Sequence, residues 1–122
     1  MLDLCGLRKL ICDINETENH MKKELGLTVN EASILCVLNE GFHKNTQIAK
    51  KMDLSVSRVS RLTSAVEKKG FVLRKVEDID KRGICFYLTD KGIKALFELQ
   101  NCKSCLPPYI ENAIKEGVKI HE

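Results

Sequence analysis

The chain has 122 residues, of which 43% are hydrophobic, and this is enough for one small domain with its own core. The formal net charge is only +3, but residues 41–82 hold eleven Lys and Arg against five Asp and Glu, a local balance of +6. The sequence has no signal peptide and no membrane-spanning stretch, so we expect a cytoplasmic protein. The concentrated positive charge favours contact with phosphate.

Two helices are predicted before the basic segment. Residues 1–25 have apolar side chains at spacings of three, four and seven, the pattern of a long amphipathic helix. Thr28 is followed three residues later by Glu31, the order of a capping box, so a second helix should begin there and end near Gly41. Its apolar face would be formed by Ile34, Leu35 and Leu38.

Residues 45–69 predict a short helix, a turn and a longer helix, the arrangement of a helix-turn-helix. Two short helices that cross steeply need small and aliphatic side chains where they meet. Ser55 can cap the second helix, while Asp53 occupies a turn position that is often glycine. The aliphatic set comprises Ile48, Ala49, Met52, Leu54, Val59 and Leu62.

The second helix of this motif should have two different faces. Val59, Leu62 and Val66 share one face at 3.6 residues per turn and are expected to face the core. Short hydroxyls around an arginine suit a major groove, whereas an ordinary solvated face would carry Lys and Glu, which favour helix more than Ser. The outward residues are Ser57, Ser60, Arg61, Ser64 and Lys68.

A β-hairpin is predicted after Gly70, which should end the helix. Residues 71–76 and 84–88 are rich in β-branched and aromatic residues and should pair. The charged loop 77–83 is either a plain solvent loop or a wing that reaches a minor groove through Lys81 or Arg82.

The segments LSVSRVSRLTSAVEKKGFV, DIDKRG and YLTDKG together resemble the MarR family of transcriptional regulators, over roughly residues 27–99. Asp80 and Arg82 match the wing motif of that family, and Thr89 and Gly92 match the start of its next helix. The resemblance implies a mostly α fold with a small β wing. It also implies a homodimer on a pseudo-palindromic operator, with Arg61 in the recognition helix and Arg82 in the minor groove.

The chain ends with two further predicted helices. One should begin at Thr89 and run to about Cys102, with Ile93, Leu96, Phe97 and Gln100 on one face. Pro107 and Pro108 break the chain, and a short last helix follows. These apolar faces need a partner, and the resemblance implies a second copy joined through the first and last helices.

We therefore expect one domain, with residues 28–89 as the winged-helix DNA reader and residues 1–25 and 90–122 as the dimerisation region. Two recognition helices would enter successive major grooves roughly 10 bp apart and repress by occluding a promoter. The resemblance also implies release by a small aromatic or phenolic effector. The candidate DNA contacts are Thr46, Gln47, Ser55, Ser57, Arg58, Ser60, Arg61, Ser64, Lys68, Asp80, Lys81 and Arg82.

The two alternative classes are an enzyme and a protein–protein interaction module. No nucleophile, base and orienting group can be assembled from the spacing, and no glycine-rich phosphate loop is present, so we expect neither an enzyme nor a cofactor. Winged helices also serve as protein–protein interaction modules without DNA binding, and that alternative predicts an apolar or acidic recognition face.

Six cysteines are present, and we expect no stable disulfide framework in a reducing compartment. Cys36 and Cys85 lie in apolar stretches and are predicted to be buried. The other four either pack without a further role or form a sensor that is oxidised or binds a soft metal, with redox favoured. No metal site is assigned, since the histidines lack ligand spacing. The candidate redox residues are Cys5, Cys12, Cys102 and Cys105.

Overall fold

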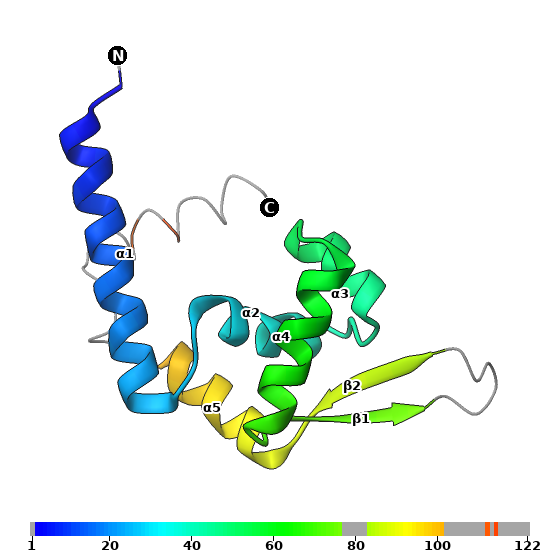
Figure 1. The fold of residues 1–122 in the computed structure, drawn as a ribbon. Coiled ribbons are helices and arrows are strands. Elements are labelled where there is room, and N and C mark those ends of the chain that lie inside the picture. The colour runs from blue at the N-terminus through cyan, green and yellow to red at the C-terminus, as the bar shows by residue number, and fades with distance from the viewer. Residues whose placement is uncertain (1, 77–82, 102–111, 113, 115–122) are drawn as a thin grey trace. The chain divides into compact units, whose positions relative to one another are not determined.

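The computed structural model describes residues 2–76, 83–101, 112 and 114. Within them the chain forms five helices and a two-stranded antiparallel sheet, a mostly α fold with a small β wing (Figure 1). Residues 28–101 form one compact unit, the winged-helix unit, and α1 belongs to another. The elements in order are α1 (Leu4–Leu25), α2 (Val29–Asn39), α3 (Asn45–Met52), α4 (Val56–Lys68), β1 (Val72–Val76), β2 (Ile84–Leu88) and α5 (Asp90–Gln100).

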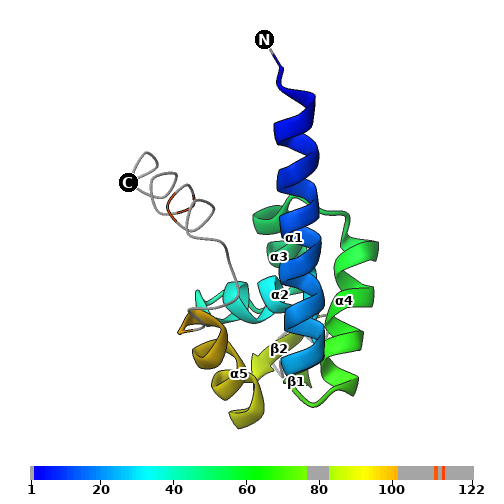
Figure 2. The ribbon, with the colours of Figure 1, turned by 90° about the vertical axis from the view of Figure 1, so that its left-hand side faces the viewer.

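The helix α1 is long and continuous, as Figure 2 shows. It begins where the Asp3 carboxylate accepts the Gly6 N–H at 3.1 Å, and it ends at Gly26, whose φ of 72° is in the left-handed region. None of the helices in the described part of the chain is both long and apolar enough to cross a membrane. Several aliphatic side chains of α1 are exposed, namely Leu4, Leu7, Leu10, Ile11 and Ile14.

Three helices of the winged-helix unit begin at the predicted caps. The hydroxyls of Thr28, Ser55 and Thr89 each accept the backbone N–H three residues on, at 3.1 Å in every case. At Thr28 the capping box is complete, because the Glu31 carboxylate accepts the Thr28 N–H at 2.9 Å. These bonds satisfy N–H groups that have no partner inside the helix, so they fix where α2, α4 and α5 start.

The turn between α3 and α4 is closed by Asp53 in the left-handed region, with φ 55°. The Leu54 N–H donates to the Ala49 carbonyl at 3.0 Å and ends α3. Ile48, Ala49 and Val59 are buried where α3 packs against α4. The predicted helix-turn-helix is therefore confirmed. At the turn, aspartate adopts the left-handed backbone conformation that glycine adopts more easily.

The buried stripe of α4 differs from the prediction at one position. Val59, Thr63 and Val66 are fully buried, whereas Leu62 is only half-buried at the edge of the stripe. A threonine can replace an aliphatic residue here because its hydroxyl donates to the Val59 carbonyl of the preceding turn at 3.1 Å. The burial therefore leaves no polar group unsatisfied.

The hairpin pairs Val72 with Leu88 and Val76 with Ile84, as an antiparallel ladder. A further pairing that the sequence did not predict joins the chain just before α3 to the other edge of β2. The Phe86 N–H donates to the His43 carbonyl at 2.9 Å, and Lys44 forms a bridge with Cys85. The stem of the wing is thereby attached to the start of α3.

Contacts with the end of α4 and with Phe71 explain the Thr-x-x-Gly motif at the start of α5. The Thr89 hydroxyl donates to the Gly70 carbonyl at 2.7 Å, which joins the start of α5 to the end of α4. A Cβ at Gly92 would overlap the backbone carbonyl oxygen of Phe71. Glycine is therefore required by this close approach, although the backbone conformation itself would admit other residues.

One burial prediction, that of Cys36, needs correction. Cys36 is exposed, because an apolar run on a helix turns one residue in each turn away from the core, while Cys85 is buried as expected. On α5, Leu96 is buried, but Ile93 and Phe97 are 54% and 66% exposed and lie on a face that the single chain leaves uncovered. The predicted last helix lies mostly outside the described residues.

Candidate nucleic-acid interface

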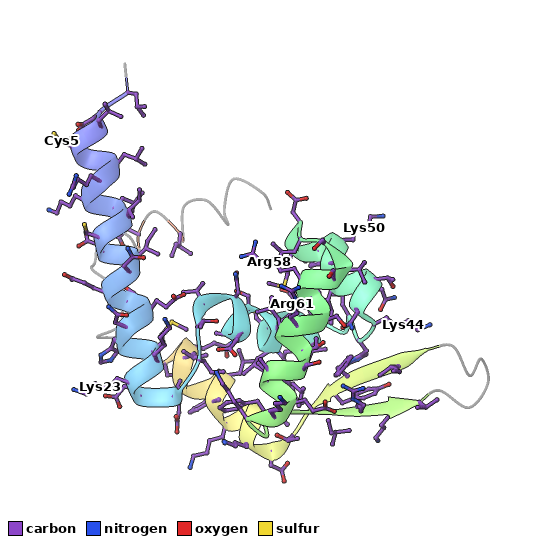
Figure 3. The ribbon with its side chains drawn as sticks, in the orientation of Figure 1. Cys5, Lys23, Lys44, Lys50, Arg58 and Arg61 are labelled. Carbon is purple, nitrogen blue, oxygen red and sulfur yellow. The ribbon has the colours of Figure 1, made fainter. Side chains whose placement is uncertain are left out.

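The outward face of α4 is formed by the predicted residues. Ser57, Ser60, Arg61 and Lys68 are exposed and Ser64 is half-buried. With Val56 and Ala65 they line a shallow open groove along the helix. Arg58 is also exposed, and Figure 3 shows it with Arg61 on α4.

This face presents hydroxyls and cations without a free carboxylate. The only acidic residue of α4 is Glu67, and its two oxygens accept from Arg74 of β1 at 2.7 and 2.8 Å. This bidentate bond lowers the pKa of the Glu67 carboxyl and raises the pKa of Arg74. The pair neutralises Glu67 and ties the end of α4 to the first strand of the wing.

Of the predicted DNA contacts that precede α4, two are exposed on α3 and one caps α4. Thr46 and Gln47 are exposed on the first turn of α3, where the side-chain amide oxygen Oε1 of Gln47 accepts the Lys44 N–H at 3.3 Å. The Ser55 hydroxyl accepts the Arg58 N–H as the cap of α4. Ser55 therefore has a structural role as a helix cap, and its predicted contact with DNA stays a prediction.

The cations of the basic segment fall into two groups. Lys51 lies 3.7 Å from Glu40, and Lys69 and Arg74 have carboxylate partners at 2.9 and 2.7 Å. In the described part of the chain, no carboxylate pairs with the second group, so its charge is available to an external anion. The second group comprises Lys44, Lys50, Arg58, Arg61, Lys68 and Lys75.

The C-terminal end of α4 is held by a partly buried ion pair. Lys69 donates to both carboxylate oxygens of Glu31 on α2 at 2.9 Å, and the Glu31 side chain is 6% exposed. Burial alone would raise the pKa of Glu31, but the Lys69 hydrogen bond, the Thr28 N–H and the Lys69 charge outweigh it and lower the pKa. Lys91 of α5 also donates to the Lys69 carbonyl at 2.6 Å. The orientation of α4 is therefore fixed by α2 and α5 together.

Several predicted site residues lie where their environment is not described. Asp80, Lys81 and Arg82 of the wing, and Cys102 and Cys105, are outside the described residues. Cys5 and Cys12 are exposed thiols on α1. Among the described residues no group of His, Cys, Asp and Glu could hold a metal ion.

Lys44 and Lys50 are exposed cations of the basic segment that are not among the predicted DNA contacts. Figure 3 shows them at α3, and Lys44 lies on the side of the wing. The local charge excess signalled such residues, but it did not distinguish them from Lys51 or Lys69, whose charges are paired.

Residues 16–99 match the family model described as Transcriptional regulator SarA/Rot. A protein of Bacillus subtilis (strain 168), the HTH-type transcriptional regulator YfiV, is 31% identical over 106 residues, which cover 80% of this chain. The chain spans 66% of the length of YfiV.

Two solved structures have the same fold. Wild-type MarR from E. coli in its apo form superposes with a TM-score of 0.69 at 17% identity, over 98% of this chain and 96% of MarR. Sco3205, a MarR family transcriptional regulator from Streptomyces coelicolor that was solved in complex with DNA, gives 0.70 at 21% identity, over 95% and 80%. The fold of this chain is therefore the winged helix of the MarR-type regulators.

Proposed function

Because this chain belongs to the SarA/Rot family of transcriptional regulators, we propose that it binds double-stranded DNA with sequence preference and uses α4 as the recognition helix. The observation that carries this proposal is the surface of α4. Three serines, two arginines and a lysine point outward or lie at the rim, while the one carboxylate of the helix is bound to Arg74. An acidic or apolar face, which the protein-interaction alternative predicts, is not what α4 presents.

The proposed roles follow from side-chain chemistry. Arg61 lies mid-helix in the groove and can pair bidentately with the edge of a guanine. The serines are short, so the helix can approach the base edges closely while their hydroxyls bond to bases or phosphates. Lys68 lies at the end of the helix, where a phosphate contact positions the protein without reading sequence. The fold of Sco3205, solved with DNA, is similar.

We further propose that the functional form is a homodimer. The exposed aliphatic side chains of α1, and Ile93 and Phe97 on α5, are apolar surfaces that a second copy would remove from water. Two copies related by a two-fold axis would present two α4 helices to a pseudo-palindromic site, with centres roughly 10 bp apart. The wings, with Lys81 and Arg82, would lie over the flanking minor grooves.

In this proposal the output is repression, since a dimer bound across a promoter excludes polymerase. An effector such as a small aromatic acid or phenol would release the dimer by favouring a spacing of the two α4 helices that does not fit DNA. Only differential affinity of the effector for the two spacings can produce this effect.

A second proposed route to release is oxidation of the candidate redox residues Cys5, Cys12, Cys102 and Cys105, of which Cys5 and Cys12 are exposed thiols on α1. A thiol count and a DNA-binding curve, each with and without mild peroxide, test this route. Fewer free thiols together with weaker binding are expected. An unchanged thiol count and unchanged affinity would remove oxidation as a signal.

The DNA-binding proposal is tested by selecting duplexes from a random pool and footprinting the selected sequence. We expect an enriched pseudo-palindrome, with protection of two major-groove segments about one helical turn apart. Enrichment of no sequence above the starting pool, by a protein with a folded far-UV spectrum, would contradict sequence-specific binding. Sedimentation of the free protein as a monomer throughout the concentration range of the assay would contradict the homodimer.

A further inference from the structure

Lys44 is the last residue before α3, and its backbone is fixed on two sides. Its carbonyl accepts the Ile48 N–H at 2.9 Å as the first hydrogen bond of α3, and its own N–H donates to Gln47. It also forms the bridge with Cys85 that attaches this segment to β2. Lys44 is therefore anchored both to the helix-turn-helix and to the stem of the wing.

The side chain of Lys44 runs across Gly83 at the base of β2. A Cβ built on Gly83 would lie 3.4 Å from Cε and 3.5 Å from Nζ of Lys44, which is ordinary contact distance. The ammonium group is exposed, and no carboxylate in the described part of the chain pairs with it. A Cβ at Gly83 would therefore fit beside the lysine, whereas a larger, branched side chain would crowd the lysine's end.

We propose that Lys44 binds a DNA phosphate at the junction between the helix-turn-helix and the wing. This inference rests on the proposed function. A duplex read by a helix in its major groove and by a wing in the adjacent minor groove has one stretch of sugar–phosphate backbone passing between the two. A cation attached to both elements at their junction faces that stretch, and Lys44 contributes to affinity without reading sequence.

A phosphate contact differs measurably from a solvated lysine. Neutralising one phosphate releases counterions, so each contact contributes about 0.9 to the slope of log affinity against log salt. Between about 50 and about 200 mM salt, a fourfold change, the affinity ratio of wild type to a variant lacking one contact should shrink about 3.5-fold. A lysine that only adds to the general field is screened over about 8 Å at physiological salt.

The first experiment measures fluorescence anisotropy of Lys44→Ala and Lys44→Arg on a random duplex and on a selected duplex over that salt range. The matched control is Lys94→Ala, which removes an exposed lysine of α5 and changes the net charge equally. Lys44→Ala should weaken both duplexes by a similar factor and lower the salt slope by about 0.9, while Lys44→Arg stays close to wild type. A slope change no larger than that of Lys94→Ala would overturn the proposal.

The second experiment displaces the charge without removing it. Gly83→Val places branched carbons where the Lys44 side chain lies, and it should weaken binding as Lys44→Ala does. The double variant should then bind no more weakly than either single variant. Additive losses would mean that Gly83 acts on the wing independently of Lys44, and would count against the proposal. If wild type itself binds no duplex, the proposed function fails; if wild type binds and the Lys44 variants match it, only this inference fails.

Discussion

Replacing Lys69 by Met should destabilise the winged-helix unit at neutral pH. The Glu31 carboxylate, 6% exposed, would lose two hydrogen bonds of 2.9 Å and its only described ion-pair partner. Breaking a buried ion pair costs roughly 3–5 kcal/mol. The Lys69 side chain is 41% exposed and Glu31 keeps the Thr28 N–H, so we expect a smaller loss of about 1–3 kcal/mol.

The effect of this substitution should depend on pH. In wild type the pKa of Glu31 lies below its ordinary value of 4.5, so its contribution to stability is present above about pH 4.5 and is lost as pH falls through the lower folded-state pKa. Without Lys69, burial would be opposed only by the hydrogen bonds to Thr28, so the pKa of Glu31 would rise from its wild-type value and the variant would be relatively more stable when the carboxyl is protonated. The destabilisation should therefore shrink between about pH 7 and about pH 4.

Urea unfolding followed by far-UV circular dichroism measures both effects, at one protein concentration because a dimer's stability depends on it. Lys94→Met is the control, since it removes an exposed lysine that has no described carboxylate partner. A loss of the same size at both pH values would show that Lys69 acts through packing rather than through the Glu31 charge. No loss at neutral pH would refute the ion-pair argument altogether.

Arg61→Ala should relax base preference and cost about 1–3 kcal/mol of binding free energy, as measured on single-base variants of a selected duplex. Lys68→Ala should instead weaken all duplexes alike and flatten the salt slope. Gly92→Ala should lower the free energy of unfolding in urea by about 1–3 kcal/mol, because its Cβ overlaps the Phe71 carbonyl oxygen. Asp53→Gly should raise it by up to about 1 kcal/mol, because glycine adopts a φ of 55° more easily.

Each of these four predictions has a result that would contradict it. Unchanged base preference in Arg61→Ala would exclude Arg61 from base readout, and an unchanged salt slope in Lys68→Ala would contradict its phosphate role. A Gly92→Ala protein as stable as wild type would mean that α5 can move away from Phe71 at no cost. A less stable Asp53→Gly protein would mean that the aspartate side chain contributes more than its backbone strain costs.

The starts of α2, α4 and α5 could be predicted because their signal is local. Thr28, Ser55 and Thr89 are each followed three residues later by the N–H that their hydroxyl accepts. The strands were predictable for the same reason, since β-branched and aromatic residues between Gly70 and Thr89 favour extended backbone. The fold class follows from these local signals in order.

Burial was less predictable, because periodicity identifies a face but not its centre. Leu62 and Thr63 lie on adjacent positions of α4, and packing against its neighbours buries the threonine and leaves the leucine half-exposed. Cys36 lies within an apolar run, but its flanking residues face the core and turn it outward. Composition alone does not distinguish these cases.

The contacts that fix the candidate site could not be predicted, since they join distant parts of the chain. Glu31 and Lys69 are 38 residues apart, and neither has a local signal for the other. The pairing of Lys44 with Cys85 likewise depends on the hairpin returning beside α3. For this reason the sequence identified a basic segment but not which of its cations are already paired.

If the proposed function is correct, this chain reads DNA sequence through α4. The most direct test of this proposal is fluorescence anisotropy of the reduced protein on duplex from upstream of its own coding region and on random duplex, at several salt concentrations. The account predicts tight binding to the upstream duplex, weaker binding to the random one, and a steep salt dependence for both. Absence of binding to either duplex by a folded dimer would contradict it and favour a winged helix that binds another protein.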